Sequence, residues 1–175
     1  LEVGEGYVKL LEPFDPTNTG GKMIPAGSEF NWTEAALEYL SNQRQLFTYQ
    51  LEGRYGTFYN GTRLSLNADL NYRIQPYASM GVSTAFSQVL LPEPYSSADL
   101  LLVGPRLDLT FTEHLFFTTL VQYNNQVDNL NMNMRFQWRF APVSDLFIVY
   151  TENAYPSGLK TKDRGIVVKL SYWIN

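Results

Sequence analysis

The sequence predicts an all-β protein, a transmembrane antiparallel up-and-down β-barrel with about ten strands in this chain. Three observations predict this class. Apolar and polar residues alternate strictly over long segments, and many of these segments are about 10 to 14 residues long. The connections between the segments are alternately short and long. At 175 residues the chain is long enough for one domain, and we take residues 1–175 as one outer-membrane barrel domain or the C-terminal part of one.

The composition favours a lipid-facing surface. Aromatic residues make up 15% and hydrophobic residues 45% of the chain, yet only 17% is charged, and the mean hydropathy is -0.21. Asn, Gln, Ser and Thr supply the polarity, whereas soluble surfaces are rich in Lys and Glu. The absence of cysteine excludes disulfides and thiolate sites. A net charge of -4 without a basic run argues against a nucleic-acid partner.

The clearest alternation covers residues 129–140, where every second residue is apolar and the residues between are Asn, Gln or Arg. A helix cannot produce this period of two. The pattern recurs at 62–73 and 165–175. Weaker versions cover residues 4–12, 30–40, 45–56, 77–88, 98–111, 114–124 and 145–152. Strands of globular proteins average about 5 to 6 residues, whereas a tilted crossing of a bilayer takes about 9 to 11, so the lengths favour a membrane.

The connections support the same fold. Short turns are expected at 41–44, 74–76, 112–113 and 141–144, and mostly longer, turn-rich connections at 13–29, 57–61, 89–97, 125–128 and 153–162. Outer-membrane barrels have short periplasmic turns and longer outer loops. This assignment places Leu1 and Asn175 on the periplasmic side. The chain starts without Met or a signal peptide, which suggests a mature form or a fragment.

Alternation alone does not separate a membrane barrel from a soluble ligand-binding barrel with its apolar face turned inward. The aromatic residues favour the membrane, because we expect them to form girdles at both interfaces. The expected girdle residues are Tyr39, Tyr72, Phe140 and Tyr172 at the periplasmic ends and Tyr55, Tyr123 and Tyr150 at the outer ends.

The opposite face carries the charges. We expect the lumen-facing polar residues, with a role in structure or selectivity, to be Glu52, Arg54, Arg63, Asp69, Arg73, Arg106, Asp108, Arg135, Arg139 and Lys169. Mixed charges inside a barrel ordinarily pair across strands. A lumen adapted to an anionic or sugar ligand is the alternative. Aromatic residues of the outer loops, such as Tyr59, Tyr95 and Tyr155, suit sugar stacking, but packing within the loops is the simpler role.

Catalysis is not expected. The single histidine, His114, follows Glu113 in a short turn at the predicted periplasmic end, far from where an outer-membrane lipase needs its base. The carboxylates give no recognisable glycosidase pair, and the segment around Asp15 is too sparse for a calcium loop. We therefore expect no catalytic residue, no metal site and no cofactor.

Six short segments resemble a known family: 56–61 (GTFYNG), 72–76 (YRIQP), 91–94 (LPEP), 121–124 (VQYN), 136–139 (FQWR) and 144–150 (SDLFIVY). Together they resemble the C-terminal barrel region of Bacteroidota outer-membrane proteins that carry an N-terminal carbohydrate-binding-family-9-like domain ahead of a domain of unknown function. The resemblance covers about residues 30–175. It implies an integral outer-membrane barrel belonging to a surface glycan-binding or uptake-associated protein. The implied partners are outer-membrane lipid, the barrel-assembly machinery, and glycan or other outer-membrane proteins.

Family members are longer, which implies that the ten strands are part of a larger barrel. The first strand agrees, because Gly4 and Gly6 weaken its start and its apolar face offers only Val8 and Leu10. We therefore expect the edge at 165–175 to be unpaired within this chain or paired with another segment. A passive porin or transport channel remains the main alternative function, and an outer-membrane hydrolase a weaker one.

Overall fold

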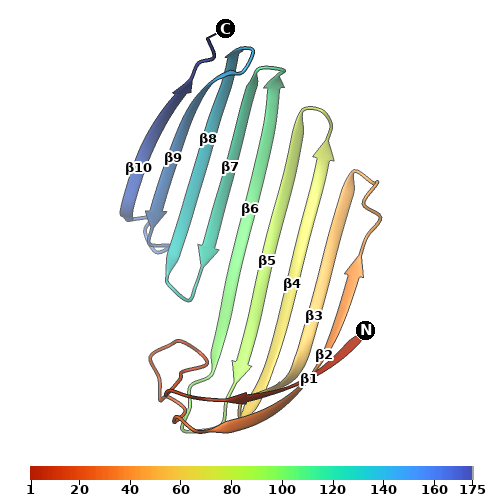
Figure 1. The fold of residues 1–175 in the computed structure, drawn as a ribbon, viewed down its shortest axis with the longest axis vertical. Helices are drawn as coiled ribbons and strands as arrows, with labels where there is room; N and C mark the ends of the chain where they lie inside the picture. Colours follow the sequence, from red (N-terminus) through yellow and green to blue (C-terminus); the bar gives the residue numbers. More distant parts are fainter. Residues whose placement is uncertain (175) are drawn as a thin grey trace. The chain divides into compact units, whose positions relative to one another are not determined.

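The computed structural model describes residues 1–174 as ten β-strands, with no helix among them (Figure 1). The strands are β1 (Glu2–Lys9), β2 (Glu29–Leu40), β3 (Phe47–Phe58), β4 (Gly61–Ile74), β5 (Ala78–Leu90), β6 (Ala98–Thr112), β7 (Leu115–Asn124), β8 (Asn129–Ala141), β9 (Ser144–Ala154) and β10 (Thr161–Ser171). Each expected strand is therefore present. In the described part of the chain, no helix is long and apolar enough to cross a membrane.

The strands form one antiparallel sheet in sequence order, from β1 to β10. The up-and-down topology is thus confirmed. The order is open, because within residues 1–174 β1 pairs only with β2 and β10 only with β9. The expectation that the first and last strands do not pair is also confirmed, and these ten strands do not close into a barrel.

The first and last strands differ most from their expected ranges. β1 ends at Lys9 rather than at residue 12, because the backbone of Leu10 bonds to Ser28 O and Gly27 N and turns the chain into the following loop. β10 begins at Thr161 and ends at Ser171 rather than spanning 165–175; Asn175 lies outside the described residues.

The expected outer loop at 57–61 was wrong. β3 continues to Phe58 and β4 begins at Gly61, so only Tyr59 and Asn60 form the turn. Tyr59 has a positive φ of 51°. A Cβ at Gly61 would overlap the carbonyl oxygen of Leu90. The Asn-Gly pair is a sequence signal for a tight hairpin. The two strands are therefore joined by this tight turn and not by the longer loop that we expected.

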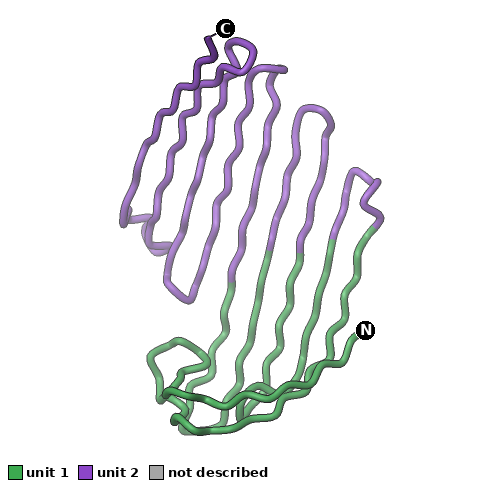
Figure 2. The backbone as a smooth tube through the Cα atoms, in the orientation of Figure 1, with its two compact units in different colours: residues 1–41, 50–68, 84–101 green, residues 42–49, 69–83, 102–175 purple. Residues whose placement is uncertain are grey.

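Contacts divide the chain into two compact units, shown in different colours in Figure 2. Unit 1 consists of residues 1–41, 50–68 and 84–101, and unit 2 of residues 42–49, 69–83 and 102–174. Unit 2 contains the regular ladder from β7 to β10, which has continuous antiparallel register between β7 and β8.

Unit 1 contains the long loop at residues 10–28. The carboxylate of Asp15 organises it, accepting hydrogen bonds from the backbone N–H groups of Thr17, Thr19, Gly20 and Gly21 at 2.9 to 3.2 Å. Burial opposes ionisation of this carboxyl, but these hydrogen bonds outweigh it and lower the pKa of Asp15. The Asp15 carboxylate is therefore the common acceptor that links these four backbone groups of the loop.

Few side chains are buried elsewhere. The buried hydrophobic residues in the described part are Leu10, Ile24, Ala36, Val89, Leu91 and Ala154. By contrast, the apolar residues of β10 are more than half exposed, with 68% for Ile166 and 66% for Leu170. The described residues therefore leave the apolar face of the sheet largely uncovered.

Candidate functional site: the polar face of the sheet

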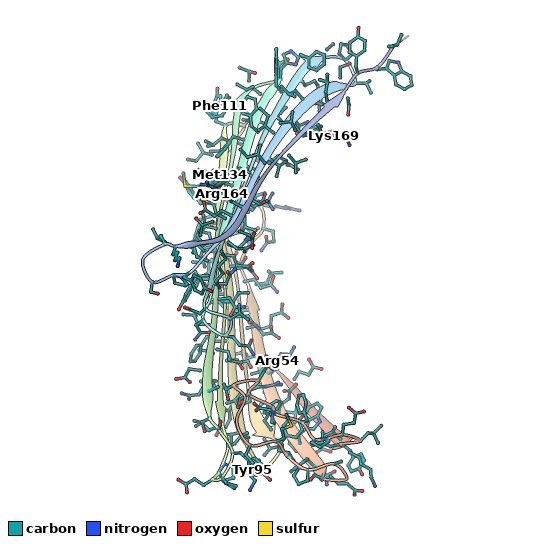
Figure 3. The ribbon with its side chains drawn as sticks, turned by 90° about the vertical axis from the view of Figure 1, so that its left-hand side faces the viewer. Arg54, Tyr95, Phe111, Met134, Arg164 and Lys169 are labelled. Atoms are coloured by element: carbon teal, nitrogen blue, oxygen red, sulfur yellow. The ribbon has the colours of Figure 1, made fainter. Side chains whose placement is uncertain are left out.

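The register of the strands collects the alternating polar residues on one face. In unit 2, Thr118 lies opposite Arg135, and Asn133 lies opposite Thr151. Side chains of neighbouring positions point to opposite faces of a strand. Figure 3 shows the result in unit 2, where Met134 and Lys169 project from opposite sides of the ribbon.

In unit 1, four charged residues of the polar face form one connected network. Arg54 donates to Glu52 at 2.6 Å and to Glu34 at 3.2 Å. The other oxygen of Glu34 accepts from Arg63 at 3.5 Å, and Asn67 donates to Glu52 at 3.0 Å. Glu34 is the centre of this network, and its place in the alternation of β2 already predicted that it lies on this face.

An aromatic-lined hollow of about 270 Å³ adjoins this network in unit 1. Its lining residues are Val8, Trp32, Glu34, Thr57, Phe58, Tyr59 and Arg63. The indole of Trp32 occupies the space that a side chain at Gly6 would fill. The guanidinium carbon of Arg63 lies 4.4 Å from the centre of the Phe58 ring, a cation–π contact. The hollow thus combines aromatic surface with paired charges.

In unit 2, Arg106 forms two hydrogen bonds with Asp108, at 2.8 and 3.1 Å. The hydroxyl of Thr118 also donates to Asp108, at 2.8 Å. The ion pair itself lies within β6 rather than across strands, and only the Thr118 hydroxyl connects it to β7.

A second charged group of unit 2 lies at the other end of β8. Arg139 approaches Asp145 at 3.5 Å, and Gln137 donates to the same carboxylate at 3.0 Å. The Arg139 guanidinium also lies 5.8 Å from the ring centre of Phe116. Asp145 was not among the expected site residues.

An amide ladder completes the polar face of unit 2. The side-chain oxygen of Asn153 accepts from Asn129 at 3.0 Å and from Asn131 at 2.9 Å. The amide nitrogen of Asn153 donates to Asp163 at 3.0 Å. At this end of the sheet, side-chain amide groups join β8, β9 and β10.

The remaining expected residues have different surroundings. Arg73 donates to the backbone carbonyls of Gln43 and Gln45 at 2.7 and 2.8 Å, so it braces the connection between β2 and β3. Lys169 lies opposite Phe147 in the ladder. In the described part of the chain, Asp69 and Lys169 form no ion pair.

The expected girdle residues lie on the opposite, apolar face. Tyr172 follows β10 directly and stacks on Phe140, with ring centres 6.3 Å apart. Trp138 joins them at 5.7 Å from Phe140 and was not among the expected residues, although it follows the same alternation. In the ladders, the other girdle residues lie opposite apolar residues: Tyr39 opposite Leu51, Tyr55 opposite Ala35, Tyr123 opposite Leu130 and Tyr150 opposite Met134. Tyr72 is 44% exposed.

One end of the apolar face in unit 2 carries charge, because Glu152 and Arg164 follow the same alternation as Tyr150 and Ile166. The hydroxyl of Tyr150 donates to Glu152 at 2.5 Å, and that of Thr161 donates to the same carboxylate at 2.6 Å. Arg164 lies opposite Glu152 in the ladder. The ends of β9 and β10 next to the connection at 155–160 are therefore polar on both faces.

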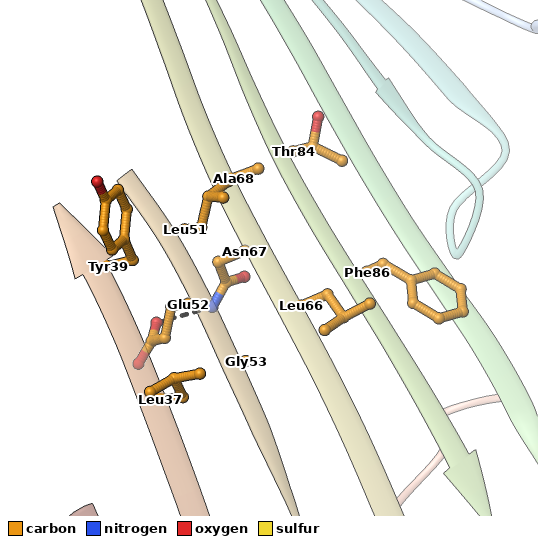
Figure 4. Close-up of a pocket in the computed structure, with 10 residues that line it drawn as sticks. All are labelled: Leu37, Tyr39, Leu51, Glu52, Gly53, Leu66, Asn67, Ala68, Thr84 and Phe86. Atoms are coloured by element: carbon orange, nitrogen blue, oxygen red, sulfur yellow. Dashed lines mark hydrogen bonds between the residues drawn. The ribbon is translucent and has the colours of Figure 1, made fainter. Parts of the chain in front are cut away.

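A hollow of about 550 Å³ interrupts the apolar face of unit 1 (Figure 4). Leu37, Leu51, Leu66 and Phe86 border it, and Gly53 contributes no side chain to fill it. Its walls are almost entirely apolar, and no cluster of titratable groups points into it, so it suits hydrocarbon better than a polar ligand.

No group of three or more His, Cys, Asp or Glu residues suited to a metal ion occurs in residues 1–174. His114 is exposed in the turn between β6 and β7, where its backbone carbonyl accepts from Arg139 N at 2.8 Å. Comparison of the chain with protein-family models, with curated proteins and with solved structures finds no match.

Proposed function

We propose that this chain is the membrane-embedded part of an outer-membrane β-barrel protein, completed by strands that are not among these ten. The observation that carries the proposal is the exposed apolar face of a sheet whose opposite face is joined by hydrogen bonds and ion pairs. Burial of apolar surface normally drives folding in water, yet the described residues bury little of it. Lipid is the environment that fits such an outer face.

The strand lengths and the sheet edges support the proposal. β4, β5, β6 and β8 have 13 to 15 residues, more than a tilted crossing needs. Unpaired strand edges are not tolerated in hydrocarbon, since their N–H and C=O groups would lack partners. The open edges of β1 and β10 therefore require further strands if the chain lies in a membrane.

The glycan-binding or uptake role rests on the resemblance of the six short segments alone. In this proposal the barrel anchors a protein that works on glycans at the cell surface, and the barrel itself has no catalytic role. A passive channel is the second candidate, because cationic groups such as Arg135 and Lys169 lie on the polar face without an ion pair in the described residues. Conductance of the intact protein in planar bilayers tests that role.

The membrane proposal is tested at two neighbouring residues of β10. The chain contains no cysteine, so Val168→Cys and Lys169→Cys each introduce one reporter thiol. Val168 lies on the apolar face opposite Ile148, and Lys169 lies on the polar face opposite Phe147. A spin label on each thiol, in the intact protein in lipid vesicles, reports accessibility to oxygen and to a water-soluble nickel complex.

We expect the label at position 168 to be relaxed by oxygen, which concentrates in lipid, and the label at position 169 by the nickel complex. Equal access of the nickel complex to both labels contradicts a lipid-facing apolar face. Recovery of the intact protein from cells in the aqueous fraction without detergent supports the soluble barrel instead.

A further inference from the structure

The hollow between the Trp32 indole and the Glu34–Arg63 pair differs from the rest of the polar face. Elsewhere on that face the described polar side chains mostly satisfy one another, as in the amide ladder of Asn153. Here aromatic rings from β2, β3 and the turn between β3 and β4 gather around a space of about 270 Å³. The feature lies entirely within unit 1 and does not depend on how the chain meets a membrane.

The aromatic wall is held in place by its neighbours. A Cβ at Gly6 would overlap the Trp32 ring, so the glycine allows the indole to pack closely against β1. Tyr59 contacts three other rings, with centres 5.8 Å from Phe14, 5.4 Å from Phe30 and 4.8 Å from Phe58. The hollow is therefore preformed, which lowers the entropy cost of binding.

Two polar groups of the wall have no hydrogen-bond partner in the described part of the chain: the indole N–H of Trp32 and the hydroxyl of Tyr59. Burial raises the pKa of Tyr59, and the charge of Arg63 offsets part of this effect. A half-buried hydroxyl of this kind is a donor and acceptor for a ligand. Arg63 makes a single hydrogen bond of 3.5 Å to Glu34, so other N–H groups of its guanidinium can donate to a ligand.

The charges around the hollow select against ionic ligands. Glu34 and Glu52 are balanced by Arg54 and Arg63 in one network. A cation in the aromatic wall would be repelled by Arg63, which already covers the Phe58 ring. An anion would compete with Glu34 for the same arginines. A neutral ligand with several hydroxyl groups fits both the rings and the donors.

We propose that this hollow binds one neutral, hydroxyl-rich saturated ring, that is, a single sugar residue. The weakly positive C–H bonds of such a ring pack on the negative face of an aromatic ring. Its hydroxyls bond to the Trp32 N–H, the Tyr59 hydroxyl and the free donors of Arg63. The volume of the hollow limits recognition to one ring, with any neighbouring residue of a longer chain outside it.

The test is calorimetric titration of the intact protein in detergent with glucose, galactose, mannose and N-acetylglucosamine. Choline chloride and sodium phosphate serve as cationic and anionic probes. We expect saturable binding of at least one sugar, no binding of choline or phosphate, and loss of sugar binding in Trp32→Ala. Tyr59→Phe keeps the ring and removes the hydroxyl, and should weaken binding about tenfold.

Trp138→Phe, on the apolar face of unit 2, is the matched control and should bind like the wild type. Retention of the heat-dependent gel shift shows that each variant is folded. The proposal is overturned if the folded wild type binds none of the four sugars, if choline or phosphate binds as tightly as the sugar, or if Trp32→Ala and Tyr59→Phe both bind the sugar unchanged.

Discussion

Met134→Arg tests the orientation of the faces most directly. Met134 lies near the middle of β8, opposite Thr119 on one side and Tyr150 on the other. If this face meets lipid, the variant places a guanidinium near the centre of the bilayer. A charged residue at that depth costs about 2 to 4 kcal/mol in a transmembrane barrel. The neighbouring change Asn133→Arg adds the same charge on the polar face, beside Leu120 and Thr151, and should cost less than about 1 kcal/mol.

The measurement is urea unfolding of the intact protein in lipid vesicles, followed by tryptophan fluorescence, with the free energy of unfolding compared among the two variants and the wild type. A cost of about 2 to 4 kcal/mol corresponds to at least a tenfold shift of the folding equilibrium. Equal costs for the two variants, or a larger cost for Asn133→Arg, would refute the assignment of the apolar face to lipid.

Three further changes test separate parts of the structure. Replacing both Leu170 and Tyr172 with Asp puts charge on the apolar face at the end of β10, and should leave the intact protein unassembled in the periplasm; a normal heat-dependent gel shift would count against this. Gly61→Ala should destabilise the protein by at least about 2 kcal/mol in the same urea assay, because its methyl would overlap a carbonyl oxygen, whereas the methyl of Gly53→Ala meets the nearest atom at an ordinary 3.5 Å and should cost little. Asp15→Ala removes the acceptor that holds the long loop, so the amide protons of that loop should exchange with solvent at least about tenfold faster than in the wild type.

Amide exchange in the loop at residues 10–28 should also depend on pH. The pKa of Asp15 is lowered in the folded protein, so its contribution to stability is present above the pKa of the unfolded chain and is lost as the pH falls through the folded pKa. Amide exchange in the loop, corrected for the intrinsic effect of pH, should therefore become faster in strongly acid solution. In Asp15→Ala this acid dependence should be absent. The same acid dependence in both proteins would show that another group holds the loop.

The positions of the strands follow from local rules that can be applied to the sequence alone. Successive side chains of a strand point to opposite faces, so the alternation in residues 129–140 was enough to separate Met134 from Asn133 without any knowledge of neighbouring strands. The same rule separates Tyr150, which lies opposite Met134 in the ladder, from Lys169, which lies opposite Phe147. The boundaries were less well predicted, because Leu10 leaves β1 through bonds to residues far along the loop.

The partners of the charged residues were decided only by the tertiary structure. Glu34 joins Arg54 and Arg63, which lie 20 and 29 positions away in sequence, because the register of three strands brings them together. Arg73 bonds instead to carbonyls of a turn. Alternation determines on which face of the sheet a side chain lies, but it does not determine which residue of the neighbouring strand lies beside it. Register depends on turn lengths such as the tight Tyr59–Asn60 turn, and whether β10 meets β1 depends on hydrogen bonds between strands at opposite ends of the chain.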